Sequence, residues 1–449
     1  MLKIYNTLSR SVEEFKPLNP PHVGMYTCGP TVYDYMHVGN LRTFTLSDLL
    51  YRTLSLTYQV KSIQNITDID DKIIKRAEEG NKDVFNVAKE FTTFFINDVN
   101  ALNIQWVMDK QPKVSDYIEQ IADYVTQLLN KGYAYKESDG SVYFDISKYS
   151  EYGKLSGIDR EGLKTGTRTL SDEYTKDDVS DFALWKSVPE GNKGSFKSKL
   201  GWGRPGWHIE CSVMSQSTLG NRLDVHVGGV DLIFPHHENE IAQSESKTGE
   251  KPFVKYWVHG AHMLVDGKKM SKSLNNFYTL ADVVSRGFDP LSLRYLYLQT
   301  HYRAEMNFTW EALEGAQTAL SKLRSDFLSW EEAKVGCAEF EQRFEDAINQ
   351  DLNLPEALSI VWEMVKSDYP GSAKKRSLLT MDEVLGLGLA GYKKEEIKIP
   401  KDVKLLIQKR NKLRKEEKFE EADKIRKEIE RLGFKLEDQK SKSLAKKIN

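Results

Sequence analysis

Residues 23–66 show a strand–helix–strand pattern that restricts the fold more than any other stretch of the chain. The run 23–28 is short, apolar and partly β-branched, and it ends at Gly29-Pro30, which predicts a buried strand that leaves its sheet at a turn. Apolar residues recur at nearly helical spacing over 40–54, with Asn40 as the expected N-cap, and a second strand-like run covers 58–66. A βαβ unit of this size predicts an α/β fold with a parallel sheet in the first third of the chain.

At 449 residues the chain is too long for one core, so we expect two to four domains. The stretch 150–199 is polar and rich in Gly, Ser, Asp and Lys, which is typical of an insertion. The α/β sequence pattern resumes at 223–227 and 256–258. Beyond residue 289 the pattern is almost wholly helical, 391–400 is typical of a linker, and 402–431 predicts a charged helical pair.

Several classes of protein are excluded by composition. No run approaches the roughly 18 apolar residues of a membrane span, and the N-terminus shows no apolar segment of a signal peptide. The three cysteines, Cys28, Cys211 and Cys337, are too widely spaced for a disulfide framework and fit a reduced setting, so we expect a cytoplasmic protein without a membrane partner.

The formal charge of -2 hides an asymmetry between the C-terminus and the rest. Residues 401–449 carry a local net charge of +7, and the preceding 400 residues carry -9. A basic end on an acidic body predicts an appendage that binds a polyanion. The alternative is a solvated helix with surplus lysines.

Two short motifs point to nucleotide chemistry. His37-Val38-Gly39-Asn40 lies between the first strand and its helix, where free backbone N–H groups and the helix dipole suit a triphosphate. Gly39 allows a nucleotide ring close to the backbone, and His37 can donate hydrogen bonds to phosphate oxygens. The second motif, Lys269-Met270-Ser271-Lys272-Ser273, follows Asp266-Gly267 in a polar loop, where two lysines can neutralise a leaving pyrophosphate when the loop closes.

The pair of motifs resembles the HIGH and KMSKS signatures of class I aminoacyl-tRNA synthetases. The second signature is matched in full, whereas Val38 and Asn40 replace the usual isoleucine and closing histidine of the first. Asparagine can still donate a hydrogen bond. The resemblance implies a Rossmann-type catalytic domain with an insertion, a helical bundle and a small basic C-terminal anticodon-binding domain. The implied limits are catalytic halves at 1–115 and 201–260, an inserted domain at 116–200, a KMSKS loop and stem-contact region at 261–305, a bundle at 306–395 and an anticodon-binding domain at 400–449.

Four residues are candidate metal ligands: Cys28, Cys211, His236 and Glu240. His236 and Glu240 are spaced i, i+4, so they share one face if a helix begins near Pro235. No spacing rule joins the two cysteines to them, and a buried cysteine, a core cysteine and a surface acidic helix would explain the same residues.

The sequences around these residues are similar to the signature blocks of cysteinyl-tRNA synthetases. The matching blocks are Met25-Tyr26-Thr27-Cys28-Gly29, the stretch from Asn65 to Lys72, Gly206-Trp207-His208-Ile209-Glu210-Cys211 and the run from Gly228 to Ser244. The match runs nearly end to end. In that family the four positions bind one zinc ion per subunit, which contacts the cysteine thiolate directly, and zinc takes such ligands in four-coordinate geometry. Serine, with a harder and less acidic hydroxyl, would be rejected without an editing site.

The resemblance also implies a two-step reaction on L-cysteine, ATP with Mg²⁺, and tRNA-Cys. The cysteine carboxylate attacks the α-phosphate of ATP, and the terminal ribose hydroxyl of the tRNA then takes the acyl group. The implied roles are His37 and Asn40 at the triphosphate, Lys269 and Lys272 at the pyrophosphate, Ser271 and Ser273 in the same loop, Gly39, Gly229 and Asp231 at the nucleotide, and Thr67 and Trp207 at the amino acid. We expect a monomer.

Other motifs in the sequence would predict different functions. Gly201-Trp202-Gly203-Arg204-Pro205-Gly206 satisfies a dinucleotide fingerprint but follows a polar loop instead of a strand. His236-His237-Glu238 lacks the H-E-x-x-H pattern of a metallohydrolase, and a non-catalytic RNA-binding relative would need broken motifs. The closest alternative is the cysteine ligase of mycothiol biosynthesis, which lacks the C-terminal RNA-binding module. The basic end favours tRNA, although the final residues lack the Gly-Thr-x-Trp ending usual in the family.

Overall fold

A computed structural model of the protein describes residues 1–105, 111–158, 168–169, 180–332, 334–393, 400–438 and 443–447. The chain divides into two compact units. The first consists of Met1–Val283 and Phe288–Leu389, and the second of Val284–Gly287 and Ala390–Asn449. Among the described residues, none of the helices combines the length and the apolar character that a membrane crossing requires.

A four-stranded parallel sheet forms the centre of the first unit. Its order is β12 (Val254–Gly260), β11 (Leu223–Gly229), β3 (His22–Thr27) and β4 (Gln59–Gln64). Strand β11 is buried along its whole length, as expected for a strand covered on both faces. The predicted βαβ unit and parallel sheet are therefore confirmed. A hairpin of β1 (Lys3–Asn6) and β2 (Ser11–Glu14) precedes them and was not predicted.

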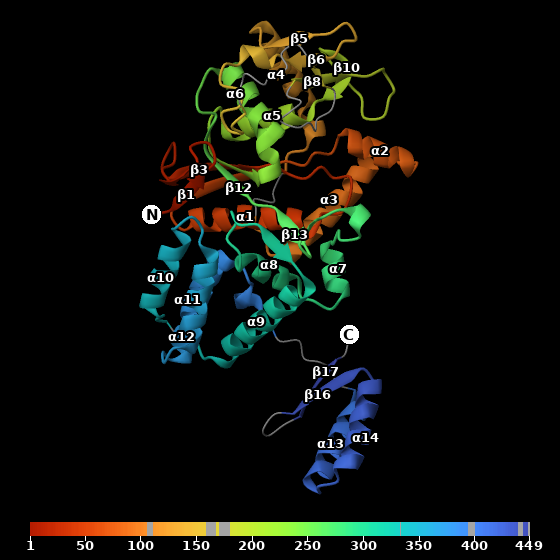
Figure 1. The fold of residues 1–449 in the computed structure, drawn as a ribbon, viewed down its shortest axis with the longest axis vertical. Helices are drawn as coiled ribbons and strands as arrows, with labels where there is room; N and C mark the ends of the chain where they lie inside the picture. The colour runs from red at the N-terminus through yellow and green to blue at the C-terminus, as the bar shows by residue number, and fades with distance from the viewer. Residues whose placement is uncertain are drawn as a thin grey trace. The chain divides into compact units, whose positions relative to one another are not determined.

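Helix α1 (Val38–Ser55) connects β3 to β4 and covers one face of the sheet (Figure 1). The prediction of Asn40 as N-cap was wrong by one turn, since His37 caps the helix and Asn40 completes a capping box from its third position. Apolar side chains of alternate strand residues pack against α1. This cluster includes Val23, Met25, Leu46, Leu50, Leu54, Val225 and Val227.

The opposite face of the sheet meets helix α5 (Trp207–Leu219), which packs beside α6 (Glu238–Thr248). Because side chains alternate along a strand, Tyr26 of β3 and His226 of β11 face this side, and their rings lie 5.2 Å apart. Cys28 follows directly after β3. The carboxyl end of the sheet is thus brought against α5 and α6.

The insertion holds a mainly antiparallel sheet (Figure 1). Helices α2 (Asp71–Glu79), α3 (Val84–Ala101) and α4 (Ile118–Asn130) precede it along the chain. Its strands are β5 (Ala134–Lys136), β6 (Val142–Phe144), β7 (Arg168–Thr169), β8 (Asp181–Ser187), β9 (Phe196–Ser198) and β10 (Gly201–Pro205). Strands β5 and β6 pair antiparallel as a hairpin, whereas much of the polar stretch, 159–167 and 170–179, lies outside the described residues. The dinucleotide-like run beginning at Gly201 lies in β10, which belongs to this antiparallel sheet. The sheet therefore continues beyond residue 200, the predicted end of the insertion. The domain limits stay a prediction.

The remainder of the first unit is mostly helical, as predicted. A three-stranded sheet of β13 (Met263–Val265), β14 (Lys268–Lys269) and β15 (Met306–Phe308) accompanies helices α7 (Leu280–Ser285), α8 (Pro290–Leu298), α9 (Trp310–Ser329), α10 (Ala338–Ile348), α11 (Leu354–Lys366) and α12 (Gly371–Leu385). Local signals set several boundaries: Asp289 caps α8 ahead of Pro290, and Gly386 ends α12 with a left-handed backbone.

A buried ion cluster joins α1 to this helical part. The Asp48 carboxylate, fully buried, accepts hydrogen bonds at Oδ2 from Arg52 Nε at 2.7 Å and from Arg294 Nη2 at 2.6 Å. Arg294 also donates to the carbonyl oxygens of Leu385 and Leu102. The helix that carries His37 is therefore fixed to α8, to the end of α3 and to the end of α12.

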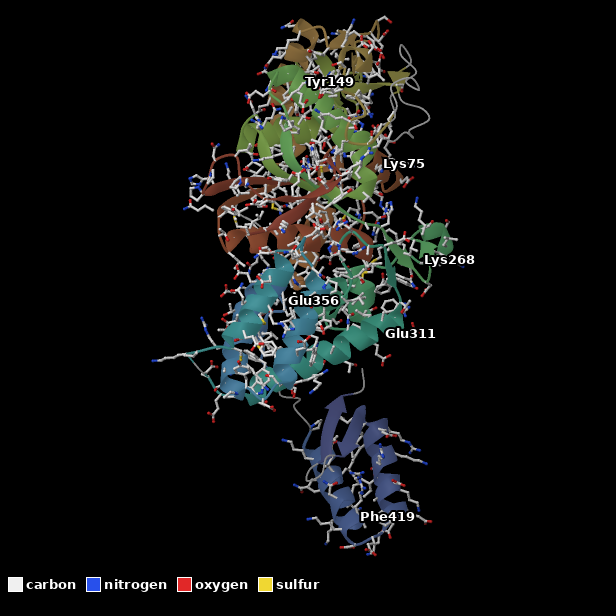
Figure 2. The ribbon with its side chains drawn as sticks, turned by 60° about the vertical axis from the view of Figure 1, so that its left-hand side comes forward. Lys75, Tyr149, Lys268, Glu311, Glu356 and Phe419 are labelled. Atoms are coloured by element: carbon white, nitrogen blue, oxygen red, sulfur yellow. The ribbon has the colours of Figure 1, made fainter. Side chains whose placement is uncertain are left out.

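The second unit contains a helical pair and a hairpin. Helices α13 (Lys401–Lys415) and α14 (Phe419–Arg431) confirm the predicted pair, and β16 (Phe434–Asp438) pairs antiparallel with β17 (Ser443–Lys447). Phe419, labelled in Figure 2, is exposed at the start of α14. A small core is made of Val403, Ile425, Ile429, Phe434 and Leu436. Most of the predicted linker, 394–399, lies outside the described residues.

Candidate active site and metal centre

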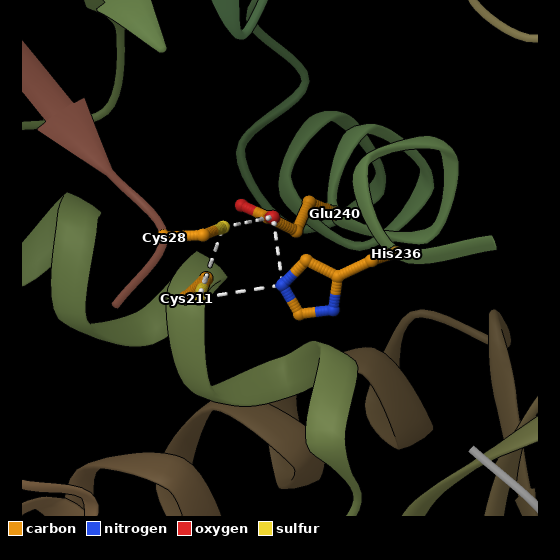
Figure 3. Close-up of side chains that lie close together, drawn as sticks. All are labelled: Cys28, Cys211, His236 and Glu240. Atoms are coloured by element: carbon orange, nitrogen blue, oxygen red, sulfur yellow. Dashed lines mark hydrogen bonds and ion pairs between the residues drawn. The ribbon is translucent and has the colours of Figure 1, made fainter. Parts of the chain in front are cut away.

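Four side chains from distant parts of the sequence meet at the carboxyl end of the sheet. They are Cys28, Cys211, His236 and Glu240, and all four are buried (Figure 3). Cys28 Sγ lies 3.6 Å from Cys211 Sγ and 3.6 Å from Glu240 Oε1. His236 Nε2 lies 3.4 Å from Cys211 Sγ and 3.2 Å from Glu240 Oε1. The ligand atoms thus face a common centre.

The elements described above place each of these residues. Cys28 leaves the end of β3, and Cys211 lies on the first turns of α5. The prediction of a helix beginning near Pro235 is confirmed, because the backbone of Phe234 is extended (φ −138°, ψ 132°) while His237 and Glu238 are helical, so the turn Ile233–His237 continues directly into α6. His236 and Glu240 therefore meet as an i,i+4 pair.

A second donor set overlaps the first and consists of Cys28, His226, His237 and Glu240. His226 distinguishes the two sets, because its Nδ1 is buried without a hydrogen-bond partner among the described residues, while its Nε2 lies 3.1 Å from Glu240 Oε2. A metal on Nε2 would force the proton onto Nδ1 as a buried unpaired donor. With the proton on Nε2, His226 donates to Oε2 and leaves Oε1 of Glu240 free for a metal.

The first donor set fits a zinc ion. Zinc bonds of about 2.0–2.3 Å in a tetrahedron place neighbouring ligand atoms about 3.3–3.8 Å apart. The four distances above, 3.2–3.6 Å, are close to that interval. His236 also has an orienting partner, because its Nδ1 lies 3.1 Å from His208 Nδ1. Burial lowers the pKa of His236 to about 3, so its ring is neutral as a metal ligand requires.

A cavity of about 370 Å³ opens beside this group. Its lining includes Cys28, His37, Asn40, Trp207, Gly229 and Asp231, so the first signature motif and the metal group face one space. His37 Nδ1 accepts a hydrogen bond from the Asn40 backbone N–H at 3.0 Å, and Asn40 Oδ1 accepts one from His37 N–H. Burial lowers the pKa of His37 to about 4, so the ring is neutral with its proton on Nε2. His37 Nε2 and the Asn40 amide nitrogen are therefore the donors that remain for a ligand.

Glycines shape the nucleotide side of the cavity. A Cβ on Gly229 would lie 2.3 Å from Asp231 Oδ1, and one on Gly39 would lie 3.0 Å from the His37 ring. Side chains at these positions would displace the groups that line the cavity.

The amino-acid candidates lie beside the metal group. The ring of Trp207 lies 4.3 Å from the ring of His236, and Trp207 lines the cavity. Thr67 is buried, donates from Oγ1 to Glu210 Oε2 at 2.8 Å and accepts from Asn65 Nδ2. Asn65 also accepts from the Gly29 N–H. Sequence reasoning singled out neither Glu210 nor Asn65 individually, although both lie within the quoted blocks.

The second signature motif follows the β13–β14 hairpin. Lys269 is exposed on β14, next to Lys268, which is labelled in Figure 2. Ser271 Oγ and Ser273 Oγ lie 2.7 Å apart. Asn276 ties the loop together, because it accepts from Ser271 N–H and donates to the Lys269 carbonyl oxygen. Asn276 was missed by sequence reasoning, since it lies outside the motif. Among the loop residues whose side chains the structure describes, none lines the 370 Å³ cavity.

The fold resembles that of solved tRNA synthetases. The methionyl-tRNA synthetase of Mycobacterium tuberculosis bound to methionyl-adenylate has a TM-score of 0.55 at 15% identity, covering 83% of this chain and 90% of that one. The leucyl-tRNA synthetase of Agrobacterium radiobacter K84, in a ternary complex with tRNA, has a TM-score of 0.60 at 10% identity, with 85% and 86% covered. The fold is that of a class I tRNA synthetase.

Sequence comparison narrows this class. Residues 14–318 match the model of the catalytic domain of class I (C) tRNA synthetases. The cysteine--tRNA ligase of Chlamydia muridarum is 43% identical over the full length of both chains. That of Leptospira interrogans serovar Lai is 40% identical, with 98% of each chain covered. The chain therefore belongs to the family of cysteine--tRNA ligases.

Proposed function

We propose that the protein activates L-cysteine with ATP and transfers it to the 3′ end of tRNA-Cys. The observation that carries this proposal is the shared space between the Cys28–Cys211–His236–Glu240 group and the His37–Asn40 capping box. The metal group suits the thiol of cysteine, and the capping box suits the triphosphate of ATP. A shared cavity would hold both substrates so that the cysteine carboxylate can reach the α-phosphate. The relatives named cysteine--tRNA ligase, with nearly complete coverage of both chains, support the same reaction.

We propose that the four ligands hold one zinc ion per subunit. When bound there, zinc supplies a soft cation that favours the thiolate of the substrate over the hydroxyl of serine. His226 fixes Glu240 through Oε2, and His208 fixes His236 through Nδ1. The ring of Trp207 packs against that of His236 at a tilt of 35° and forms part of the cavity wall.

In the first step, an oxygen of the cysteine carboxylate attacks the α-phosphorus of ATP, and the bond to the leaving pyrophosphate breaks. His37 Nε2 and the Asn40 amide donate to the triphosphate, while Gly39, Gly229 and Asp231 accommodate the nucleoside. Lys269 and Lys272 approach the pyrophosphate when the loop closes over ATP with Mg²⁺, and Ser271 and Ser273 shape that loop. Thr67, held by Glu210, lies at the amino-acid end.

In the second step, the terminal ribose hydroxyl of the tRNA attacks the carbonyl carbon of the adenylate, and AMP leaves. The basic second unit supports tRNA as acceptor. The mycothiol alternative is not favoured, because the cysteine--tRNA ligases match this chain from end to end. We propose that the protein acts as a monomer in the cytoplasm, where its three buried thiols stay reduced.

The experiment that tests this function is cysteine-dependent ATP–pyrophosphate exchange by the purified protein, combined with metal analysis. We expect one zinc per chain and exchange with cysteine far above that with serine. Robust exchange with serine, or full exchange by a zinc-free protein, would contradict the proposal.

A further inference from the structure

A second cavity, of about 640 Å³, lies next to the catalytic one and has no role in the activation step described above. Its walls come from α3, from the start of α7 and from the segment after the second signature motif. Three of its residues, Asp34, Tyr35 and Phe277, also line the catalytic cavity. A ligand that extends out of the catalytic site across these residues would enter this space.

One wall of this second cavity is aromatic and partly open to solvent. Tyr35 is 40% exposed and Phe94 of α3 is 36% exposed, with ring centroids 4.7 Å apart. Phe91 supports the pair, since its ring lies 5.4 Å from Tyr35. Neighbouring aromatic rings held at a surface offer the stacking platform that unpaired nucleobases use.

The charged groups of the cavity are carboxylates. None of the described residues that line it is lysine or arginine, so a phosphate would find no cationic partner there. Asp282 is occupied by capping, because its Oδ2 accepts from the N–H and hydroxyl of Thr279. The carboxylate of Asp98 has no hydrogen-bond or ion-pair partner among the described residues, and burial raises its pKa to about 7. The pocket thus combines a stacking wall with an acceptor that lacks a donor.

We propose that this cavity binds an amino-bearing nucleobase from the unpaired 3′ strand of the tRNA. The inference rests on the proposed function, which brings the terminal ribose of that strand into the adjoining catalytic cavity. The base stacks on Phe94 and Tyr35, and its exocyclic amino group donates to the Asp98 carboxyl. Adenine and cytosine carry such an amino group, whereas uracil and hypoxanthine present an acceptor oxygen at the same place.

The first test separates the two steps of the reaction. In the Phe94→Ala variant, cysteine-dependent pyrophosphate exchange should stay within threefold of wild type, since this cavity takes no part in activation. The kcat/KM for tRNA should fall about 5- to 150-fold, the range for losing one stacking partner. The matched control is Phe85→Ala on the same helix, which removes a ring that is 44% exposed and does not line the cavity. It should leave both steps unchanged.

A second test identifies the base by exchanging hydrogen-bond partners. At each of the last three tRNA positions the amino group is replaced by oxygen, with uridine for cytidine and inosine for adenosine. At one of these three positions, the replacement should lower the kcat/KM of the wild-type enzyme for tRNA about tenfold. The Asp98→Asn variant, whose side chain can donate an N–H, should reduce or reverse that preference.

Several outcomes would overturn the inference. They are an unchanged kcat/KM for tRNA in Phe94→Ala, a raised KM for ATP in the same variant, or an Asp98→Asn variant with the base preferences of the wild type at all three positions. Failure of the proposed function itself would look different, because the wild-type protein would then support neither exchange nor aminoacylation with cysteine.

Discussion

Replacing Asp48 with asparagine should destabilise the first unit strongly. The carboxylate binds Arg52 and Arg294, whose side chains are 6% and 0% exposed, and both guanidinium groups donate to the same oxygen, Oδ2. An amide of the same shape removes the negative charge and turns one of its ends into a donor that faces other donors. Removing one partner of a buried ion pair costs about 3–5 kcal/mol, because the remaining charge is left without compensation. We expect a loss of that size in the free energy of unfolding.

Urea unfolding followed by tryptophan fluorescence measures this loss in the first unit alone. The second unit contains no tryptophan, because all eight lie between positions 106 and 362. With an unchanged dependence on urea, the lower midpoint gives the change in free energy. The control is Lys322→Ala, which breaks an exposed i,i+4 pair with Asp326 and should cost no more than about 0.5 kcal/mol. If Asp48→Asn cost no more than this control, the reasoning about the buried cluster would be refuted.

Further predictions concern the backbone, the loop and the metal. Gly29→Ala should prevent native folding, because the added Cβ would lie 1.6 Å from the Asn65 carbonyl oxygen. Gly315→Ala, where the added Cβ meets open space within α9, should instead raise the free energy of unfolding by about 0.5–1 kcal/mol. Thermal melts followed by circular dichroism compare the two variants. Lys272→Ala should lose ATP–pyrophosphate exchange while keeping zinc. The control, Lys268→Ala in the neighbouring hairpin, should retain exchange. Full exchange by Lys272→Ala would disprove the role of Lys272. Chelation should abolish cysteine activation and lower the melting temperature, and zinc should restore both, whereas a melting curve insensitive to chelator would count against a zinc site.

The sequence was most informative where local physics determines the structure. The apolar run ending at Gly29-Pro30 and the helical spacing after it predicted β3, α1 and the parallel sheet correctly. The His37 cap was missed because histidine is rarely an N-cap, whereas Asn40 is a common one. The hairpin β1–β2 was missed because its strands are four residues each and half exposed, so they lack a clear alternating pattern.

The metal group shows where reasoning from the sequence stops. The i,i+4 spacing of His236 and Glu240 is a local signal, but Cys28 and Cys211 are 183 residues apart and meet only because β3 and α5 pack together. Their selection depended on family resemblance. The role of His226 could not be predicted at all, since it depends on which ring nitrogen has no partner among the described residues of the folded interior.

The most direct test of the central claim is aminoacylation of transcribed tRNA-Cys with labelled cysteine, with glucosaminyl-inositol present as a competing acceptor. We predict that the label appears on tRNA-Cys, depends on ATP and is absent from the amino sugar. Transfer to the sugar with none to tRNA would contradict the account, because the same catalytic site would then serve a different acceptor.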